Sequence, residues 1–126
     1  MIVDTNALSA AADDDPAVIA ILARADQMAI PVIVLGEYRY GIAQSRHRAI
    51  YENWLAGLLL RDCAVLDINE QTTQHYAEIT LDLSRKARPI PTNDLWIAAL
   101  CRQHSLPLLS RDRHFDQVTG MKRMGW

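Results

Sequence analysis

Short apolar runs are separated by longer stretches of mixed polarity along the whole chain. Ala29–Leu35 is a near-continuous, β-branched run that lacks the apolar–polar alternation of a half-exposed strand, which is typical of a strand buried in a parallel sheet. We therefore predict a sheet of four to five parallel strands, the last a short edge strand at the C-terminal end. The expected strands are Met1–Val3, Ala29–Leu35, Cys63–Ile68, Leu106–Leu109 and Met121–Trp126.

The stretches between these runs place apolar residues at helical spacing. Pro16 after the acidic Asp13–Asp15 marks one helix start, and Thr92 is expected to be the N-cap of another. Strand–helix alternation of this kind predicts a three-layer α/β/α fold, with no linker to divide residues 1–126 into more than one domain. The other helices are expected over Gly36–Ser45, Ala49–Leu60, Asn69–Arg85 and Asp94–His104.

Composition places the chain among cytoplasmic globular proteins without a membrane partner. The 126 residues are 50% hydrophobic, which is enough for a real core. Asp4 precedes any long apolar stretch, so no signal peptide is expected, and no run is long enough to span a bilayer. Cys63 and Cys101 lie in apolar segments and are too few for a disulfide framework. We expect both to be reduced.

Acidic side chains follow three of the predicted strands. Asp4 comes directly after the first, Glu37 two residues after the second in the first turn of the next helix, and Asp112 three residues after the fourth. The helix that begins near Asp94 leads into the fourth strand, so it must start at the edge where that strand will end. Functional sites in open parallel sheets lie at this carboxyl edge. The four carboxylates are therefore predicted to share one rim.

Four carboxylates at one rim predict a metal site. Singly, Asp4 could terminate a strand and Asp94 could favour a helix N-terminus, but like charges at this density repel unless a cation binds. All-oxygen ligands suit Mg²⁺, with Mn²⁺ as the alternative, and such an ion can activate water to attack a phosphodiester. One ion or two fit the pattern equally. The histidines share no spacing that indicates zinc or a general base; they are His47, His75, His104 and His114.

The charge balance bears on a nucleic-acid substrate. A net charge of −2 argues weakly against one, but the bases outnumber the acids once the four proposed ligands are set aside. Nearly all the bases are Arg, which binds phosphate oxygens two at a time. Arg111 and Arg113 flank Asp112 and are candidate RNA contacts. Arg46 and Arg88 lie in basic runs for which a solvated helix end is the stronger interpretation.

Five segments carry a resemblance to a known family. The sequence resembles the PIN-domain ribonucleases, and within them the VapC-type toxins of bacterial type II toxin–antitoxin pairs, over essentially the whole chain. The matching segments are Ile2–Asn6, Glu37 with Tyr40-Gly41, Arg88-Pro89-Ile90, Asn93–Ala99 and Ser110–Phe115.

The resemblance implies an Mg²⁺-dependent endoribonuclease with ligands at the four acids named above. It also implies a homodimer and a cognate VapB-type antitoxin that blocks the acidic site. Thr5, Asn6 and Ser110 match positions that support the carboxylates, although Thr is more usual than Ser at position 110. Asp116, one helical turn beyond Asp112, could share or take the role of fourth acid.

Three other classes of protein fit parts of the pattern. A receiver-like signalling domain, with Asp67 as phosphoacceptor, would need a second acid beside Asp4 and a Lys after the fourth strand, and the chain has neither. A haloacid-dehalogenase-type phosphatase would need Asp where Asn6 stands. A catalytically silent PIN-like binding module would not need all four acids. The RNA target leaves no signature in the sequence.

Overall fold

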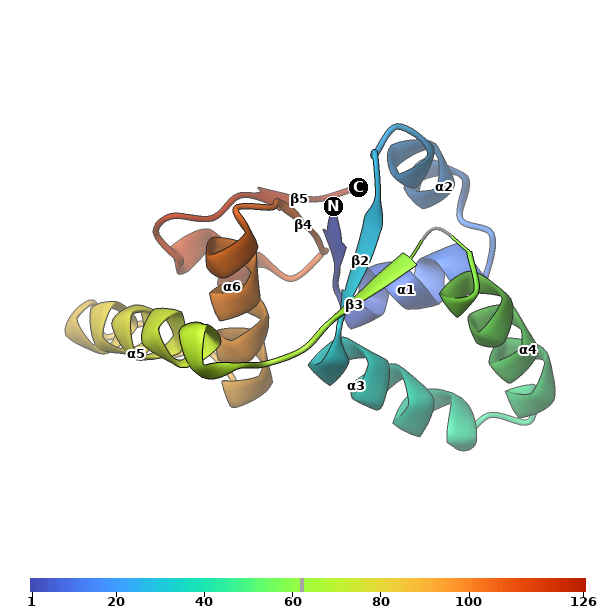
Figure 1. The fold of residues 1–126 in the computed structure, drawn as a ribbon, viewed down its shortest axis with the longest axis horizontal. Helices are drawn as coiled ribbons and strands as arrows, with labels where there is room; N and C mark the ends of the chain where they lie inside the picture. The colour runs from blue at the N-terminus through green and yellow to red at the C-terminus, as the bar shows by residue number, and fades with distance from the viewer. Residues whose placement is uncertain (62) are drawn as a thin grey trace.

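The structure is a computed structural model that describes residues 1–61 and 63–126, and it contains one parallel sheet. The strand order is β3-β2-β1-β4-β5, with β1 and β4 near the centre (Figure 1). The prediction of four to five parallel strands in an α/β fold is confirmed. The strands are β1 (Ile2–Val3), β2 (Met28–Pro31), β3 (Cys63–Leu66), β4 (Leu108–Leu109) and β5 (Arg123–Met124).

Helices cover the sheet on both sides, with α5 and α6 together on one and α1, α3 and α4 on the other (Figure 1). Within the described part of the chain, no helix combines the length and apolar character needed to cross a membrane. The helices are α1 (Thr5–Ala12), α2 (Pro16–Ala23), α3 (Val32–Ala43), α4 (Arg48–Leu59), α5 (Glu70–Arg85) and α6 (Thr92–His104), with a 3₁₀ turn, η1 (Arg113–Gln117), before β5.

The centre of the core fixes the position of the first acid. The four residues of β1 and β4 are fully buried, and Val3 pairs in register with Leu109. Directly after β1, the backbone N–H of Asp4 donates to the Leu109 carbonyl at 3.0 Å. This register brings Asp4 and Ser110 side by side at the carboxyl edge of the sheet.

The prediction of a strand over Ala29–Leu35 is wrong in its second half. β2 ends at Pro31, and Val32 begins α3. Pro31 has the extended conformation of a helix N-cap, with φ −57° and ψ 139°. In the first turn of α3, Val34 is fully buried whereas Val32 is 37% exposed. A short apolar run does not distinguish such a helical turn from a strand. Glu37 therefore lies in the second turn of α3.

Two helix starts also differ from the prediction. α1 was not expected, and it begins directly after Asp4, whose side chain accepts from the backbone N–H of Thr5. Thr92 is not the N-cap of α6 but its first residue, because Pro91 takes the extended N-cap position without a side-chain cap. Asp94 is consequently the third residue of α6, within the first turn.

The remaining boundaries agree with the sequence within a few residues. The fourth strand is shorter than expected, since the backbone N–H of Leu106 donates to the Cys101 carbonyl and so belongs to the end of α6. The helix predicted at Asn69–Arg85 begins at Glu70, with Asn69 and Thr72 forming a reciprocal capping box. Cys63 and Cys101 are both free thiols.

Candidate metal centre

Asp4 occupies the junction between β1 and α1 and is only 5% exposed. Its Oδ1 accepts from the Thr5 backbone N–H at 2.8 Å, and its Oδ2 accepts from Ser110 Oγ at 2.6 Å and Asn6 Nδ2 at 3.3 Å. Burial raises the pKa of Asp4, these donors partly offset the rise, and the charges of Glu37 and Asp112 add to it. The carboxylate is thus held in place by neutral groups that leave its charge uncompensated.

Ser110 connects two of the acids. It is fully buried directly after β4, and its Oγ accepts from the backbone N–H of Asp112 at 2.9 Å while donating to Asp4. Asn6 Nδ2 lies 3.3 Å from the same Oγ, and Asn6 Oδ1 accepts from the Arg111 backbone N–H at 3.2 Å. These contacts tie the loop after β4 to the start of α1, as a support for the carboxylates requires.

Glu37 reaches the rim from α3. Thr5 Oγ1 donates to Glu37 Oε1 at 3.0 Å, which joins the first residue of α1 to the second turn of α3. The predicted position of Glu37 next to a strand end was wrong, yet its carboxylate still lies close enough to Asp4 to raise the pKa of that group.

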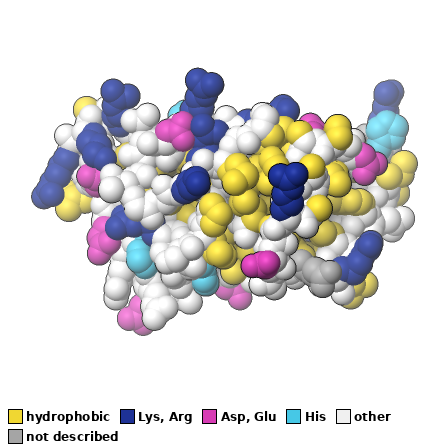
Figure 2. Space-filling model, turned by 90° about the horizontal axis from the view of Figure 1, so that it is seen from above, with side chains coloured by type: hydrophobic (Ala, Val, Ile, Leu, Met, Phe, Trp, Pro, Cys, Tyr) yellow, Lys and Arg dark blue, Asp and Glu magenta, His cyan; other side chains and the backbone are white. Residues whose placement is uncertain are grey.

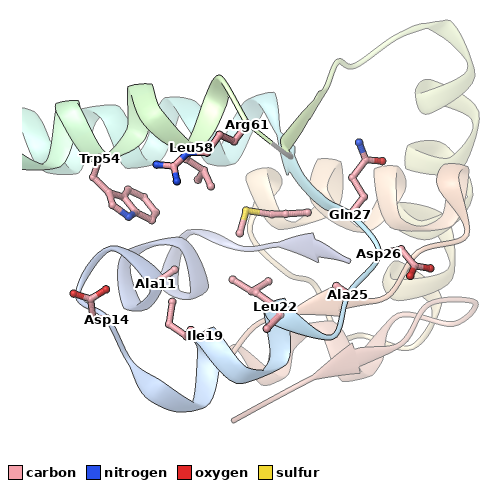
Figure 3. A pocket seen from close by; sticks show the side chains of 12 residues that line it. Ala11, Asp14, Ile19, Leu22, Ala25, Asp26, Gln27, Trp54, Leu58 and Arg61 are labelled. Atoms are coloured by element: carbon pink, nitrogen blue, oxygen red, sulfur yellow. The ribbon is translucent and has the colours of Figure 1, made fainter.

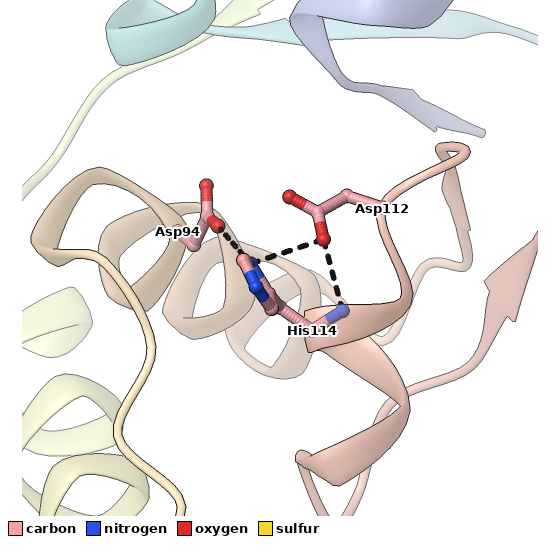
Figure 4. Close-up of side chains that lie close together, drawn as sticks. All are labelled: Asp94, Asp112 and His114. Carbon is pink, nitrogen blue, oxygen red and sulfur yellow. Dashed lines mark hydrogen bonds and ion pairs between the residues drawn. The ribbon is translucent and has the colours of Figure 1, made fainter.

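Asp94 and Asp112 form the other part of the cluster, with His114 between them (Figure 4). His114 Nδ1 lies 3.0 Å from Asp112 Oδ1 and 3.5 Å from Asp94 Oδ2. Burial, followed by the charges of Asp112 and Asp4, raises the pKa of Asp94 to about 6, and His114 partly opposes this rise. One ligand atom from each of the three side chains lies within 4.8 Å of the others. The sequence indicated both acids but gave no role to His114.

The donor set fits a divalent cation. The four predicted acids lie close enough for their charges to interact. Glu37 and Asp112 raise the pKa of Asp4, and Asp112 and Asp4 raise the pKa of Asp94. Carboxylate oxygens are the ligands that hard divalent ions take, and the raised pKa values of Asp4 and Asp94 mark a cluster short of positive charge. These features are those of an acidic metal site at the carboxyl edge of the sheet.

Asp116 is turned away from this cluster. Its two carboxylate oxygens accept from Arg123 Nε at 2.8 Å and Nη2 at 2.9 Å. The hydrogen bonds from Arg123 lower the pKa of Asp116. Of the two candidates for the fourth acid, Asp112 is therefore the one that lies with Asp94.

The predicted RNA-contacting arginines fall in different places. Arg88 and Arg113 line a cavity of about 700 Å³ that Asp112 and His114 also line. Arg111 places its guanidinium carbon 4.5 Å from the centre of the Trp126 ring. Arg46 lies in the turn after α3, which ends at Ala43. Glu37 is six residues before Ala43, or about 9 Å along the helix axis, so the C-terminal half of α3 separates Arg46 from Glu37.

A second cavity, of about 520 Å³, opens at the other edge of the sheet between α2 and α4 (Figure 3). It is lined largely by apolar side chains, among them Leu22, Trp54 and Leu58, and by residues that precede β2 and β3 rather than follow them. Figure 2 views the molecule from this end and shows hydrophobic side chains gathered there, with Lys and Arg around them. This surface is more apolar than the acidic rim, although Asp14 and Asp26 also line the cavity.

Comparisons with known proteins agree with this architecture. The PIN domain family model matches residues 1–121. Ribonuclease VapC2 of Haemophilus influenzae is 30% identical over 107 residues, which cover 81% of this chain and 77% of the relative. A structure of VapBC2 from Rickettsia felis bound to promoter DNA has a chain with a TM-score of 0.84 and 25% identity, covering 99% of this chain and 97% of that one.

A third match is a structure of VapBC-5 from Mycobacterium tuberculosis, a member of the VapBC family of toxin–antitoxin systems. It superposes with a TM-score of 0.71 at 26% identity over 98% of this chain and 94% of its own. The chain belongs to the PIN-domain family and, within it, to the VapC ribonucleases. The resemblance that the sequence motifs indicated is confirmed.

Proposed function

We propose that residues 1–126 form one PIN domain that acts as a cytoplasmic, Mg²⁺-dependent endoribonuclease and as the toxin of a VapBC-type pair, with Mn²⁺ as the alternative ion. The observation that carries the proposal is the convergence of Asp4, Glu37, Asp94 and Asp112, from four separate segments, in a chain of the VapC family. These four side chains are the proposed ligands. When bound, a divalent ion activates water and stabilises the charge that develops on the phosphodiester.

The chain's own residues would hold this centre in shape. Ser110, Asn6 and Thr5 fix the orientation of Asp4 and Glu37 through neutral hydrogen bonds, and so preserve the negative charge that a cation needs. Supporting contacts of this kind are normally worth a factor of about 10–100 in metal affinity or activity. Because Asp4 and Glu37 are already oriented, binding of the ion would require little rearrangement of these side chains.

The cavity next to Asp112 is the proposed path of the RNA strand. Arg88 and Arg113 line it, and among the described residues no ion pair engages either one. Lys86 lines it too but already contacts Asp82 at 2.7 Å. Unpaired guanidinium groups a short distance from the acids suit the phosphates that flank a scissile bond. Arg111 packs on Trp126 and is a weaker candidate, as is the distant Arg46.

We also propose a VapB-type antitoxin and a second copy of the chain as partners. Support for the antitoxin comes from the structural matches, which include a member of the VapBC family of toxin–antitoxin systems. The apolar cavity between α2 and α4 offers the chain a surface for a protein partner, with Ile19 44% exposed at its margin. Co-expression with the product of the adjacent short reading frame, followed by gel filtration, tests both partners.

The decisive test is the chemistry of cleavage. The purified chain is expected to cut RNA with Mg²⁺ or Mn²⁺, to stop with EDTA, and to leave 5′-phosphate and 3′-hydroxyl ends because activated water attacks phosphorus. A 2′,3′-cyclic phosphate product would mean that the ribose hydroxyl is the nucleophile and would overturn the mechanism. Binding of RNA without cleavage would favour the silent binding module.

A further inference from the structure

His114 lies within the cluster formed with Asp94 and Asp112, but the proposed function assigns it no role. Its ring occupies the space between Asp94 and Asp112, which come from α6 and from the loop after β4 (Figure 4). We propose that His114 is a further ligand of the divalent ion through Nδ1, and that this imidazole biases the site toward Mn²⁺ over Mg²⁺. The inference rests on the proposed function, because it concerns the same metal centre.

The distances around the ring match adjacent ligands of one ion. An octahedral ion with ligands at about 2.1 Å places neighbouring ligand atoms about 3 Å apart. Nδ1 lies 3.0 Å from Asp112 Oδ1 and 3.5 Å from Asp94 Oδ2. The three groups could therefore bind a common cation with side-chain adjustments of a few tenths of an ångström.

The backbone holds His114 in this position. Asp112 is the N-cap of η1, and its Oδ1 accepts from the backbone N–H of His114 at 2.9 Å. The following residue, Phe115, is 1% exposed and anchors the turn in the core. The backbone of His114 is thus placed by a short turn anchored in the core, while its side chain is 55% exposed and within reach of the two acids.

Two roles of the ring have to be distinguished. An imidazole that only donates a hydrogen bond to the acids would orient them without touching the ion. An imidazole ligand would instead change the metal preference, because ring nitrogens favour transition metals whereas carboxylates and water suit Mg²⁺. The ratio of Mn²⁺ to Mg²⁺ affinity separates the two roles.

The experiment titrates MnCl₂ and MgCl₂ by calorimetry into the full chain and into the variants His114→Ala, His114→Asn and His104→Ala. His104 is exposed at the end of α6 and serves as the matched control. Asn keeps a hydrogen-bond donor near the position of Nδ1 but has no imidazole. We expect both His114 variants to lose about tenfold or more in Mn²⁺ affinity, with a smaller loss for Mg²⁺, and the control to match wild type.

Pulsed electron paramagnetic resonance of bound Mn²⁺ gives a second readout that needs no enzyme activity. Wild type labelled with ¹⁵N-histidine should show a nitrogen coupling that His114→Ala abolishes. Mn²⁺ bound without this coupling, or an unchanged metal preference in His114→Asn, would overturn the role of His114 while leaving the carboxylate site intact. Failure of wild type to bind either ion would overturn the metal centre itself. Absence of the coupling in wild type counts against the proposal even if a variant unfolds, and His114→Asn offers a second variant for assigning a coupling that is present.

Discussion

The two sides of the acidic cluster are built differently. On one side, Asp4 is buried and Glu37 is half-buried, and both accept hydrogen bonds from neutral donors such as Thr5 and Ser110. On the other side, Asp94 and Asp112 face each other with His114 between them. The first side is fixed by the sheet and by α1, whereas the second depends on the approach of α6 and η1.

This difference separates two tasks that a metal site must perform. Neutral donors hold carboxylates in place without cancelling their charge, so the Asp4 side provides a rigid base. The Asp94 side is less enclosed, and the pKa of Asp94 is raised to about 6. A bound cation would offset the burial and the repulsion that raise the pKa values of Asp4 and Asp94. The following predictions test whether the two sides respond differently.

The largest effect should come from neutralising a proposed ligand. We expect Asp4→Asn, Glu37→Gln and Asp94→Asn each to lower Mg²⁺-dependent RNA cleavage by about a thousandfold, equivalent to about 4 kcal/mol of lost transition-state stabilisation. Asp94→Asn should leave the fold intact and the metal-free stability unchanged or higher, because it removes a charge from a repelling cluster. Cleavage assays measure the loss of activity, and thermal unfolding in EDTA measures the metal-free stability. Near-wild-type activity in any variant would mean that the substituted residue is not a ligand.

Removing the hydroxyl of Ser110 should weaken metal binding on the Asp4 side without changing a proposed ligand. Ser110→Ala leaves Asp4 Oδ2 and the Asp112 backbone N–H without their shared partner. Asp4 Oδ2 keeps only the longer hydrogen bond from Asn6 Nδ2 at 3.3 Å, and the Asp112 N–H loses its acceptor. We expect metal affinity to fall by about 10–100-fold and the chain to lose about 1–3 kcal/mol of stability. Calorimetry and chemical denaturation measure these losses. Ser9→Ala, at an exposed serine on α1, is the control, and equal behaviour of the two variants would contradict the supporting role.

The stability of the metal-free protein should depend on pH through the Asp94 side of the cluster. The folded pKa of Asp94, about 6, lies above its ordinary value of 3.8, so the folded chain binds this proton more tightly than the unfolded chain does. The group therefore destabilises the metal-free protein above pH 6, and the penalty disappears as the pH falls toward 4. Melting temperatures in EDTA from pH 4 to 8 should show Asp94→Asn more stable than wild type at pH 8 and equal to it at pH 4. A constant difference across this range would mean that Asp94 is not perturbed.

Topology made most of this site predictable from the sequence. Asp4 and Asp112 follow parallel strands, and α6 must begin at the edge where β4 ends, so three acids could be placed without knowing any side-chain contact. Glu37 was placed at the rim from a wrong element boundary, because the apolar residues Val32–Leu35 form the first turn of α3, in which Val34 is fully buried, and not the end of a strand. The side chain of a residue in the second turn can still reach the rim.

His114 and the partner of Asp116 could not be predicted in the same way. Both depend on how the 3₁₀ turn η1 folds after Asp112, and a turn of five residues has no hydrophobic period to reveal its orientation. Within η1, the apolar Phe115 is the one residue that the sequence indicates as buried, and its burial turns the polar residues on either side of it outward. The contact between Asp116 and Arg123 joins η1 to the edge strand β5, a pairing that no local pattern indicates.

The smallest effect is expected at Asp116, where the two candidates for the fourth acid can be compared. Asp116→Asn should keep near-wild-type cleavage and Mg²⁺ affinity, because its carboxylate binds Arg123 rather than the cluster. Its cost should be about 1 kcal/mol of stability, since the Asp116 side chain is 46% exposed although Arg123 is only 16% exposed. Asp112→Asn should lower activity and calorimetric Mg²⁺ affinity clearly, and the double variant should be scarcely worse than Asp112→Asn alone. If Asp116→Asn is the more damaging single change, the fourth ligand is Asp116, and η1 must rearrange when the metal binds.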